Sequence, residues 1–313
     1  NYIGAIRQYV AGQDRGDPAI YCIVNLHAIT VAYDPVELRR AVLDTTAMLL
    51  AAGLDPARCI LFRQGDVHEH TELCWLLTAV TAHGELNRMT QFKDKSAKQR
   101  ELVSAGLFLY PVLQAADVLA YQAHEVPVGE DQRQHVELMR EVAIRFNGRF
   151  GETFVVPEAR IPGVGAKIMD LQSPENKMST TAPSEQGTLL VLEDENSLIK
   201  KVKSAVTDSG SEVRVADDKP GISNLIEILA VIRGVDHADV EREFEGQQYG
   251  AFKSAVADEV VEFLRPVRER YDEIRPDEAA IEATLAEGAD RARALASQTL
   301  ATVRERMGVG PSA

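Results

Sequence analysis

The chain is short of cysteine and lacks long hydrophobic runs, and each shortage excludes a class of protein. Its three cysteines, Cys22, Cys59 and Cys74, lie among apolar neighbours, without a CxxC pair or a cysteine–histidine ligand pattern. This usage indicates small buried side chains in a reducing compartment, so we expect a cytoplasmic protein. The apolar runs are far too short to cross a bilayer and no secretory signal opens the chain, so we expect no membrane partner.

Positive charge is also scarce. The sequence has 34 Lys and Arg against 48 Asp and Glu, which gives a formal net charge of −14. Sequence-independent binding of a polyanion draws its affinity from many phosphate contacts by basic side chains, so this balance opposes it. We therefore expect no DNA partner, and an RNA must be bound through a local basic patch. Lys200, Lys201 and Lys203 are candidates for local positive charge, and a solvated helix face explains them equally well. A chain of 313 residues with 45% hydrophobic residues should fold, in about two domains.

The first half of the chain alternates strand and helix patterns. AIYCIV (19–24) predicts a strand, DPVELRRAVLDTTAMLLAAG (34–53) a helix that Asp34 caps and Gly53 ends, and CILF (59–62) a second strand. Strand, helix and strand in this order are typical of a parallel sheet with crossover helices. The sequence therefore predicts an α/β domain first.

Helical periods dominate the rest of the chain. They occur at 71–82, 110–122 and 131–146, and beyond about Leu189 hardly a strand pattern appears. Pro266 should kink or interrupt its helix. We predict that a helical domain follows the α/β domain, and no internal repeat is visible.

Several polar residues stand where a ligand can use them, and each also has an ordinary structural explanation. His27 directly follows the first strand, where ligands collect in open α/β sheets, although a lone histidine is more often satisfied within the core. Asp117 rises from an apolar helix near Tyr110 and Gln114, and its partner is either another side chain or a ligand donor. HEH at 68–70 has no third ligand at zinc spacing, so we interpret it as solvated surface.

A turn and a loop are further candidates. In VPVGEDQRQHVEL (126–138), Gly129 precedes Glu130, Asp131 and Gln132 at a helix N-terminus, whose N–H groups favour oxygen-rich ligands. Asp131 can equally be an ordinary helix cap. KMSTT (177–181) places one cation, one thioether and three hydroxyls on a predicted loop, whereas the basic stretch RMTQFKDKSAK is more often a solvated helix face.

These segments occur together in one order, which is far more specific than any single segment. In chain order they are NYIGAI, LHAIT, NRMTQFKDKS, YPVLQAAD, VPVGEDQRQH, GAKIMDL, KMSTT, IKKVKSAVTDS and KPGISNL. With this set the chain closely resembles the bacterial tryptophanyl-tRNA synthetases, which are class I enzymes, from Asn1 to about Met307. The resemblance implies a Rossmann-like parallel-sheet catalytic domain at 1–186, a helical anticodon-binding domain at 187–287 and a C-terminal helix at 288–313.

The resemblance also implies a reaction and a homodimer. The carboxylate of L-tryptophan attacks the α-phosphorus of ATP and releases pyrophosphate, and the adenylate then passes its aminoacyl group to the terminal ribose of tRNA(Trp). No protein nucleophile is needed. Catalysis would consist of positioning and of charge stabilisation by Lys177, Ser179, Lys95, backbone donors and the Mg²⁺ that accompanies ATP.

By the same resemblance, specific residues bind the substrates. Asp117 would accept the indole N–H, which phenylalanine cannot supply. Tyr110 and Gln132 would hold the amino group, and the pocket would be completed by His27, Gln114, Val126 and Val128. KMSTT corresponds to the family's KMSKS loop. The ATP site would comprise Asn1, Gly129, Glu130, Asp131, Gln132, Ile168, Met169, Lys177, Met178, Ser179, Thr180 and Thr181, with no metal site of the protein's own.

The chain departs from the family pattern in several places. The other class I signature, which normally precedes NYIGA and ends at Asn1, is absent, so we expect the natural protein to be longer. Thr180 replaces the second lysine of KMSKS, and loss of one preorganised donor costs about 2–4 kcal/mol of transition-state stabilisation. Gln114 stands where many relatives have Met, and Asn25 where Asp is frequent.

Two alternatives stay open beside an active enzyme. The altered loop and the absent signature allow a catalytically silent paralogue that senses tryptophan or RNA, although GEDQ, Lys177 and Asp117 weigh against it. The other alternative is the tyrosine-specific sister enzyme or another nucleotidyltransferase of the superfamily. An apolar pocket around one carboxylate favours indole over phenol.

Overall fold

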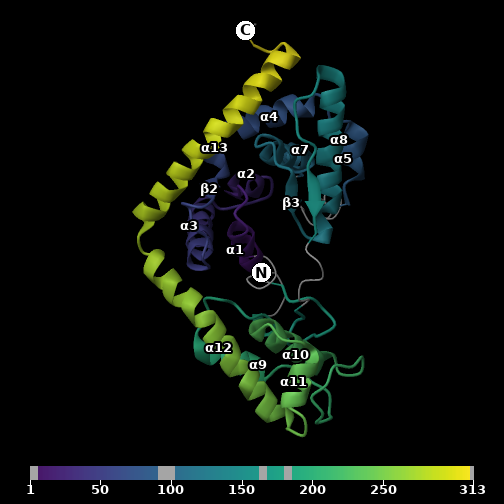
Figure 1. Cartoon of the computed structure of the whole chain (residues 1–313), viewed down its shortest axis with the longest axis vertical. Coiled ribbons are helices and arrows are strands. Elements are labelled where there is room, and N and C mark those ends of the chain that lie inside the picture. Colours follow the sequence, from purple (N-terminus) through teal and green to yellow (C-terminus); the bar gives the residue numbers. More distant parts are fainter. Residues whose placement is uncertain (1–5, 91–102, 162–167, 180–184, 311–313) are drawn as a thin grey trace. The chain divides into compact units, whose positions relative to one another are not determined.

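The computed structural model describes residues 6–90, 103–161, 168–179 and 185–310 (Figure 1). It divides into two compact units, each built from segments that are separate in the sequence. We call the first the helical unit, which comprises Asn1–Arg15, Met48–Leu54 and Val164–Pro276. The second, the sheet unit, comprises Gly16–Ala47, Asp55–Gly163 and Asp277–Ala313.

The predicted strand, helix and strand are confirmed in the sheet unit. β1 (Ile20–Ile23) pairs in parallel with β2 (Ile60–Arg63), with Ile20 opposite Ile60. Between them lies α3 (Pro35–Ala51), whose start is capped as predicted: Asp34 Oδ1 accepts from the backbone N–H groups of Val36 at 2.8 Å and Glu37 at 2.9 Å. Gly53, at φ +109°, follows the end of this helix.

A second parallel strand pair lies further along the same unit. β3 (Glu125–Pro127) pairs with β4 (Glu158–Arg160), and α8 (Arg133–Phe150) connects them. The other helices of this part are α2 (Asn25–Ala28), α4 (Glu69–Thr78), α5 (His83–Arg88) and α7 (Ala105–Leu119), with the 3₁₀ helices η2 (Gln64–Asp66) and η3 (Glu130–Gln132). The fold is α/β, as predicted from the sequence.

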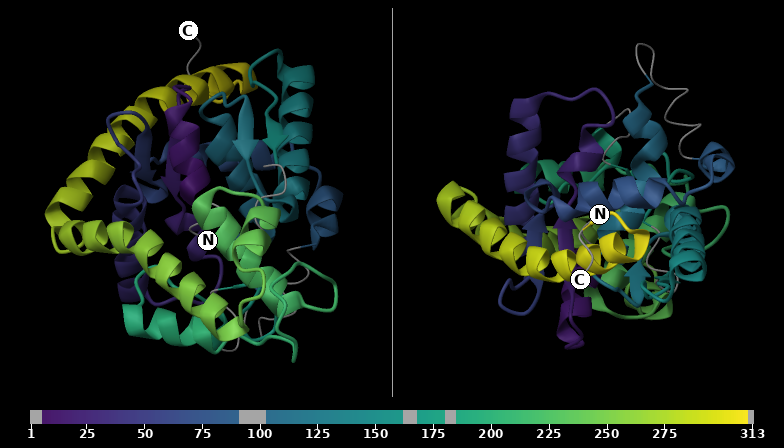
Figure 2. Two further views of the ribbon diagram at one scale, coloured as in Figure 1. Left: turned by 60° about the horizontal axis from the view of Figure 1, so that its bottom comes forward. Right: turned by 90° about the horizontal axis from the view of Figure 1, so that it is seen from above.

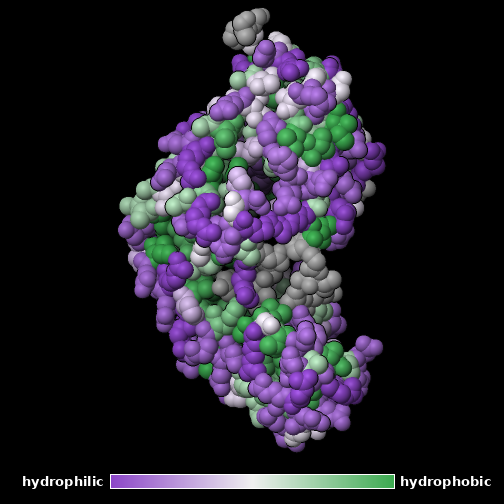
Figure 3. Space-filling view, viewed as in Figure 1, coloured by the Kyte–Doolittle hydropathy of each residue, from purple (hydrophilic) through white to green (hydrophobic). Residues whose placement is uncertain are grey.

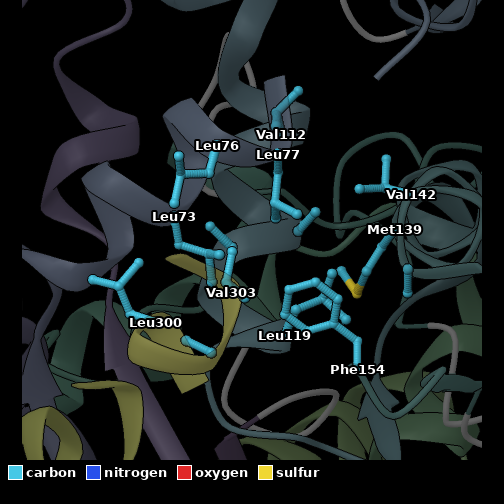
Figure 4. Packing of buried hydrophobic residues seen from close by; sticks show 14 of the residues in the cluster. Leu73, Leu76, Leu77, Val112, Leu119, Met139, Val142, Phe154, Leu300 and Val303 are labelled. Atoms are coloured by element: carbon cyan, nitrogen blue, oxygen red, sulfur yellow. The ribbon is translucent and has the colours of Figure 1, made fainter. Parts of the chain in front are cut away.

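The last helix of the chain completes the core of the sheet unit. α13 (Glu278–Met307) packs along β2 and beside α4, and is the long yellow helix in Figures 1 and 2. Its Leu300 and Val303 join Leu73 of α4 and Met139 of α8 in one buried cluster (Figure 4). Gly288 permits this approach, because a Cβ at that position would lie 1.8 Å from the Leu61 carbonyl oxygen.

The helical unit has a separate core. Its helices are α1 (Arg7–Asp14), α9 (Glu195–Lys203), α10 (Pro220–Arg233), α11 (His237–Glu243) and α12 (Tyr249–Ile274), with the 3₁₀ helix η4 (Glu185–Gly187). Its buried cluster includes Leu198, Leu229 and Phe252. α12 runs through Pro266, so this proline does not interrupt the helix, and the alternative prediction of a kink stays a prediction. None of the described helices is long and apolar enough to cross a membrane.

The domain boundaries predicted at 186/187 and 287/288 describe continuous segments, whereas the two units are discontinuous. The second boundary falls inside α13, which is a single helix. The functional division of the chain stays a prediction. On the face shown in Figure 3, hydrophilic residues dominate and apolar residues gather in small patches.

Candidate active site

The Asp117 carboxylate lies at the centre of a buried hydrogen-bond network in the sheet unit. Its side chain, on α7, is 9% exposed, and its Oδ1 lies 2.7 Å from both Gln64 Nε2 and His70 Nδ1. Its Oδ2 lies 2.7 Å from His27 Nε2. Burial by itself raises the pKa of Asp117, but hydrogen bonds from His27 and His70 outweigh it and leave that pKa below its ordinary value. The carboxylate is therefore ionised and acts only as an acceptor.

Two of the donors come from the carboxyl ends of the paired strands. His27 lies in α2, just after β1, and Gln64 lies in η2, directly after β2. Side-chain amides join the two strand ends: the backbone N–H of Leu26 donates to Gln64 Oε1 at 2.9 Å, and that of Gly65 donates to Asn25 Oδ1 at 2.9 Å. Asn25 thus has a structural role here. The edge of the sheet where ligands were expected to collect does carry polar side chains.

The predicted tryptophan-binding residues of α7 lie on one side of that helix. Tyr110, Gln114 and Asp117 are spaced by four and three residues, which places them on one helix face. Tyr110 and His27 are in edge-to-face contact, with ring centroids 6.3 Å apart. The Tyr110 hydroxyl lies 2.8 Å from His135 Nε2, and burial raises the pKa of this tyrosine to about 12. The structure therefore brings His27, Tyr110 and Asp117 together, with Gln114 half-buried among them.

The interpretation of HEH at 68–70 as solvated surface is wrong for His70. This side chain is fully buried, because His70, Leu73 and Leu77 form the inward face of α4. Its spacing of three and seven residues from Leu73 and Leu77 was the sequence signal that identifies it as a core residue. Gln64, also fully buried, was missed as well, although its place after the second strand is equivalent to that of His27.

The segment after β3 carries the next group of predicted ligands. Val126 lies in β3, Val128 and Gly129 follow it, and η3 contains Glu130, Asp131 and Gln132. Val126 packs against the core of the sheet unit. Gln132 Nε2 donates to Asp131 Oδ2 at 2.8 Å, and Glu130 forms an exposed ion pair with the first residue of α8. The roles assigned to these side chains stay predictions.

In the helical unit, the described residues of the segments GAKIMDL and KMSTT, which are 168–171 and 177–179, lie in the two arms of one hairpin. Met169 and Lys177 form an antiparallel bridge, and the Met178 N–H donates to the Ile168 carbonyl at 3.0 Å. Ile168 and Met178 pack against the core of the helical unit, whereas Lys177 and Ser179 are exposed. The hairpin therefore anchors its apolar side chains and presents a cation and a hydroxyl to solvent.

Buried polar side chains fix this hairpin at both arms. Asn224 of α10 accepts from the Met169 N–H at 2.7 Å and donates to the Met169 carbonyl at 2.8 Å. Thr188 Oγ1 donates to the Ser179 carbonyl at 2.8 Å. The backbone that positions Lys177 is thus tied to the helical core.

One of the lysines considered for local positive charge has another role. Lys201 is buried, where its Nζ lies 2.7 Å from a Glu193 oxygen and 2.9 Å from the Thr188 carbonyl. Lys200 and Lys203 are exposed. Of these three lysines, Lys200 and Lys203 can offer positive charge to a partner.

Four predicted residues, Asn1, Lys95, Thr180 and Thr181, lie outside the described residues. The described ones supply an ionised acceptor in a partly apolar setting and, separately, an exposed cation. This set suits binding and charge stabilisation.

Comparisons with known proteins agree with the sequence resemblance. The family described as tRNA synthetases class I (W and Y) matches residues 2–265. Tryptophan–tRNA ligase 2 of Streptomyces avermitilis is 51% identical over 314 residues, which cover 100% of this chain and 93% of the relative. The tryptophanyl-tRNA synthetase of Mycoplasma pneumoniae superposes with a TM-score of 0.88 at 32% identity, over 99% of this chain and 93% of that one. The enzyme of Campylobacter jejuni, complexed with ADP and tryptophan, gives 0.85 at 34% identity, over 98% and 95%.

Proposed function

The chain belongs to the class I tRNA synthetases for tryptophan and tyrosine, and we infer from its relatives and its site that it is a tryptophan–tRNA ligase. It activates L-tryptophan with ATP to tryptophanyl-adenylate and transfers the aminoacyl group to tRNA(Trp). The observation that carries this assignment is the identity of 51% to a tryptophan–tRNA ligase along the whole chain.

The Asp117 carboxylate explains how indole is selected. The carboxylate is buried and ionised and has no hydrogen to donate. It therefore stabilises a bound ring that donates a hydrogen bond to it. Phenylalanine offers no donor and leaves the buried charge short of a partner, and such mismatches discriminate by about 10⁴ or more. Val126 and Val128 supply apolar walls, Gln114 faces the ring, and Tyr110 and Gln132 hold the amino group.

The proposed ATP-binding residues are assigned for each unit by itself. In the sheet unit, Gly129 and η3 present backbone N–H groups near the N-terminus of α8, which suit phosphate or ribose oxygens. In the helical unit, the exposed Lys177 ammonium and Ser179 hydroxyl meet the departing pyrophosphate. Mg²⁺ enters with ATP as part of the substrate. Lys95 adds positive charge that stabilises the pyrophosphate. Thr180 supplies a hydroxyl where the KMSKS loop of the family has its second lysine.

The remaining parts of the proposal concern the tRNA and a second copy of the chain. The helical domain at 187–287 reads the anticodon, with Lys200 and Lys203 as exposed cations. Two chains form a cytoplasmic homodimer. Trp75, the single tryptophan of the sequence, is 72% exposed in one chain, so its fluorescence can report whether a partner covers it.

The test is exchange of labelled pyrophosphate into ATP, run with each of the twenty amino acids. We expect exchange with tryptophan alone, and its loss in Asp117→Ala. Tyrosine-dependent exchange would identify the sister enzyme. A folded preparation that binds ATP and tryptophan without exchange would identify a sensor.

A further inference from the structure

Behind Asp117, the sheet unit holds a second layer of polar side chains that the proposed function does not use. Tyr121 follows Asp117 by four residues and lies in the turn just after α7, which ends at Leu119. The His70 ring lies between them, with Nδ1 2.7 Å from Asp117 Oδ1 and Nε2 2.5 Å from the Tyr121 hydroxyl. One imidazole therefore bridges the carboxylate and the phenol.

The proton positions in this bridge follow from the chemistry of its ends. Because the ionised carboxylate only accepts, His70 Nδ1 carries a hydrogen. Burial raises the pKa of Tyr121, so its hydroxyl stays protonated and donates. His70 Nε2 accepts from it, so the bridge runs from the Tyr121 hydroxyl through the His70 ring to the Asp117 carboxylate.

Apolar packing fixes the plane of the His70 ring. Phe62 of β2, which is fully buried, contacts His70 edge to face with centroids 5.7 Å apart, and Tyr121 at 5.9 Å. The His70 and Tyr121 rings are themselves 5.4 Å apart in an edge-to-face arrangement. These edge-to-face contacts with two aromatic rings hold the imidazole in the orientation that directs its Nδ1–H at the carboxylate.

A count of acceptor positions shows what the bridge achieves. A carboxylate has about four lone-pair positions. Oδ1 of Asp117 uses two, for Gln64 and His70, and Oδ2 uses one, for His27. One position on Oδ2 is left for a ligand.

We propose that Tyr121 and His70 are positioning residues that set specificity: they lock Asp117 as an acceptor with one open position, on Oδ2, which takes a ring N–H. This rests on the proposed function, which supplies tryptophan as the ligand. Without the Tyr121 hydroxyl, the buried Nε2 of His70 loses its donor, although the carboxylate still holds the hydrogen on Nδ1. The ring is then held by a hydrogen bond at one end only, so Asp117 Oδ1 loses its fixed donor and the carboxylate can turn its open position away from the ligand.

The test compares two ligands in Tyr121→Phe. The first is tryptophan and the second is β-(benzothien-3-yl)alanine, in which sulfur replaces the ring N–H. We expect the dissociation constant of tryptophan, measured by calorimetry, to rise about tenfold, as for loss of one hydrogen bond. That of the analogue should change less than twofold. Tyr33→Phe, which removes an exposed hydroxyl from the same unit, is the matched control and should change neither.

A second variant tests the inference independently of any change in protein stability. In His70→Asn the side-chain amide can replace the Nδ1–H donor but has no counterpart of Nε2 to accept from Tyr121, so adding Tyr121→Phe should weaken tryptophan binding no further. ¹⁵N spectra of labelled histidine should show His70 protonated on Nδ1 in the wild type and also in Tyr121→Phe, where the Nε2 resonance should shift because it has lost its hydrogen bond. Equal loss for both ligands, additive effects in the double variant, or an Nε2–H ring in the wild type would overturn the inference. A wild type that binds no tryptophan overturns the proposed function instead.

Discussion

Replacement of Asn224 with alanine is expected to loosen the hairpin that carries Lys177. The Asn224 side chain is 4% exposed and satisfies both the N–H and the carbonyl of Met169, at 2.7 and 2.8 Å. Alanine leaves these two backbone groups without their partner. Each costs about 1–3 kcal/mol, so the variant should lose about 2–6 kcal/mol of unfolding free energy. For units of this size that corresponds to a decrease in Tm of about 5–25 °C.

Calorimetric unfolding and pyrophosphate exchange together check this prediction. Because Asp117 belongs to the other unit, the KM for ATP should rise several-fold in Asn224→Ala while the KM for tryptophan stays unchanged. Asn196→Ala, which truncates an exposed asparagine on α9, serves as the control and should alter neither quantity. A Tm within 1 °C of the wild type, or an equal rise in both KM values, would refute the reasoning.

Three further outcomes are expected. Gly288→Ala should lower the unfolding free energy by about 1–3 kcal/mol in urea titrations, because its Cβ would overlap the Leu61 carbonyl, whereas Gly148→Ala, with open space around it, should be neutral or stabilising. The lowered pKa of Asp117 means that its ionised form stabilises the fold above about pH 4 and that this contribution is lost as the pH falls through the lowered pKa, so the stability difference between wild type and Asp117→Asn in urea should shrink from pH 7 to pH 3. Thr180→Lys should speed adenylate formation in a single-turnover assay or leave it unchanged; a large loss of rate would show that the loop uses another geometry.

Local chemistry was sufficient to predict the elements that position the site. Asp34 and Gly53 delimit α3 through a cap and a left-handed glycine, both of which act within a few residues. The parallel pairing of β1 and β2 follows from the intervening helix. Such signals are readable because they depend on neighbours in the sequence.

The inner layer of the site was harder to predict, because it depends on long-range partners. His70 was judged by its polar type and not by its phase on an apolar helix face, and Gln64 has no pattern beyond its place after a strand. Lys201 was likewise treated as exposed charge although its partners Glu193 and Thr188 bury it. A buried polar residue whose hydrogen-bond partners lie far away in the sequence leaves little local pattern by which to predict it.

The packing of α13 on β2 imposes an order on the folding of this protein during its synthesis. The buried cluster that includes Leu73 and Met139 is closed by Leu300 and Val303, which are translated after all its other members. The segment Val164–Pro276 leaves the ribosome before α13 and has its own cluster, so it can reach its native packing first. The sheet unit therefore waits for α13, and until this helix is made the nascent chain exposes the apolar surface that α13 will cover.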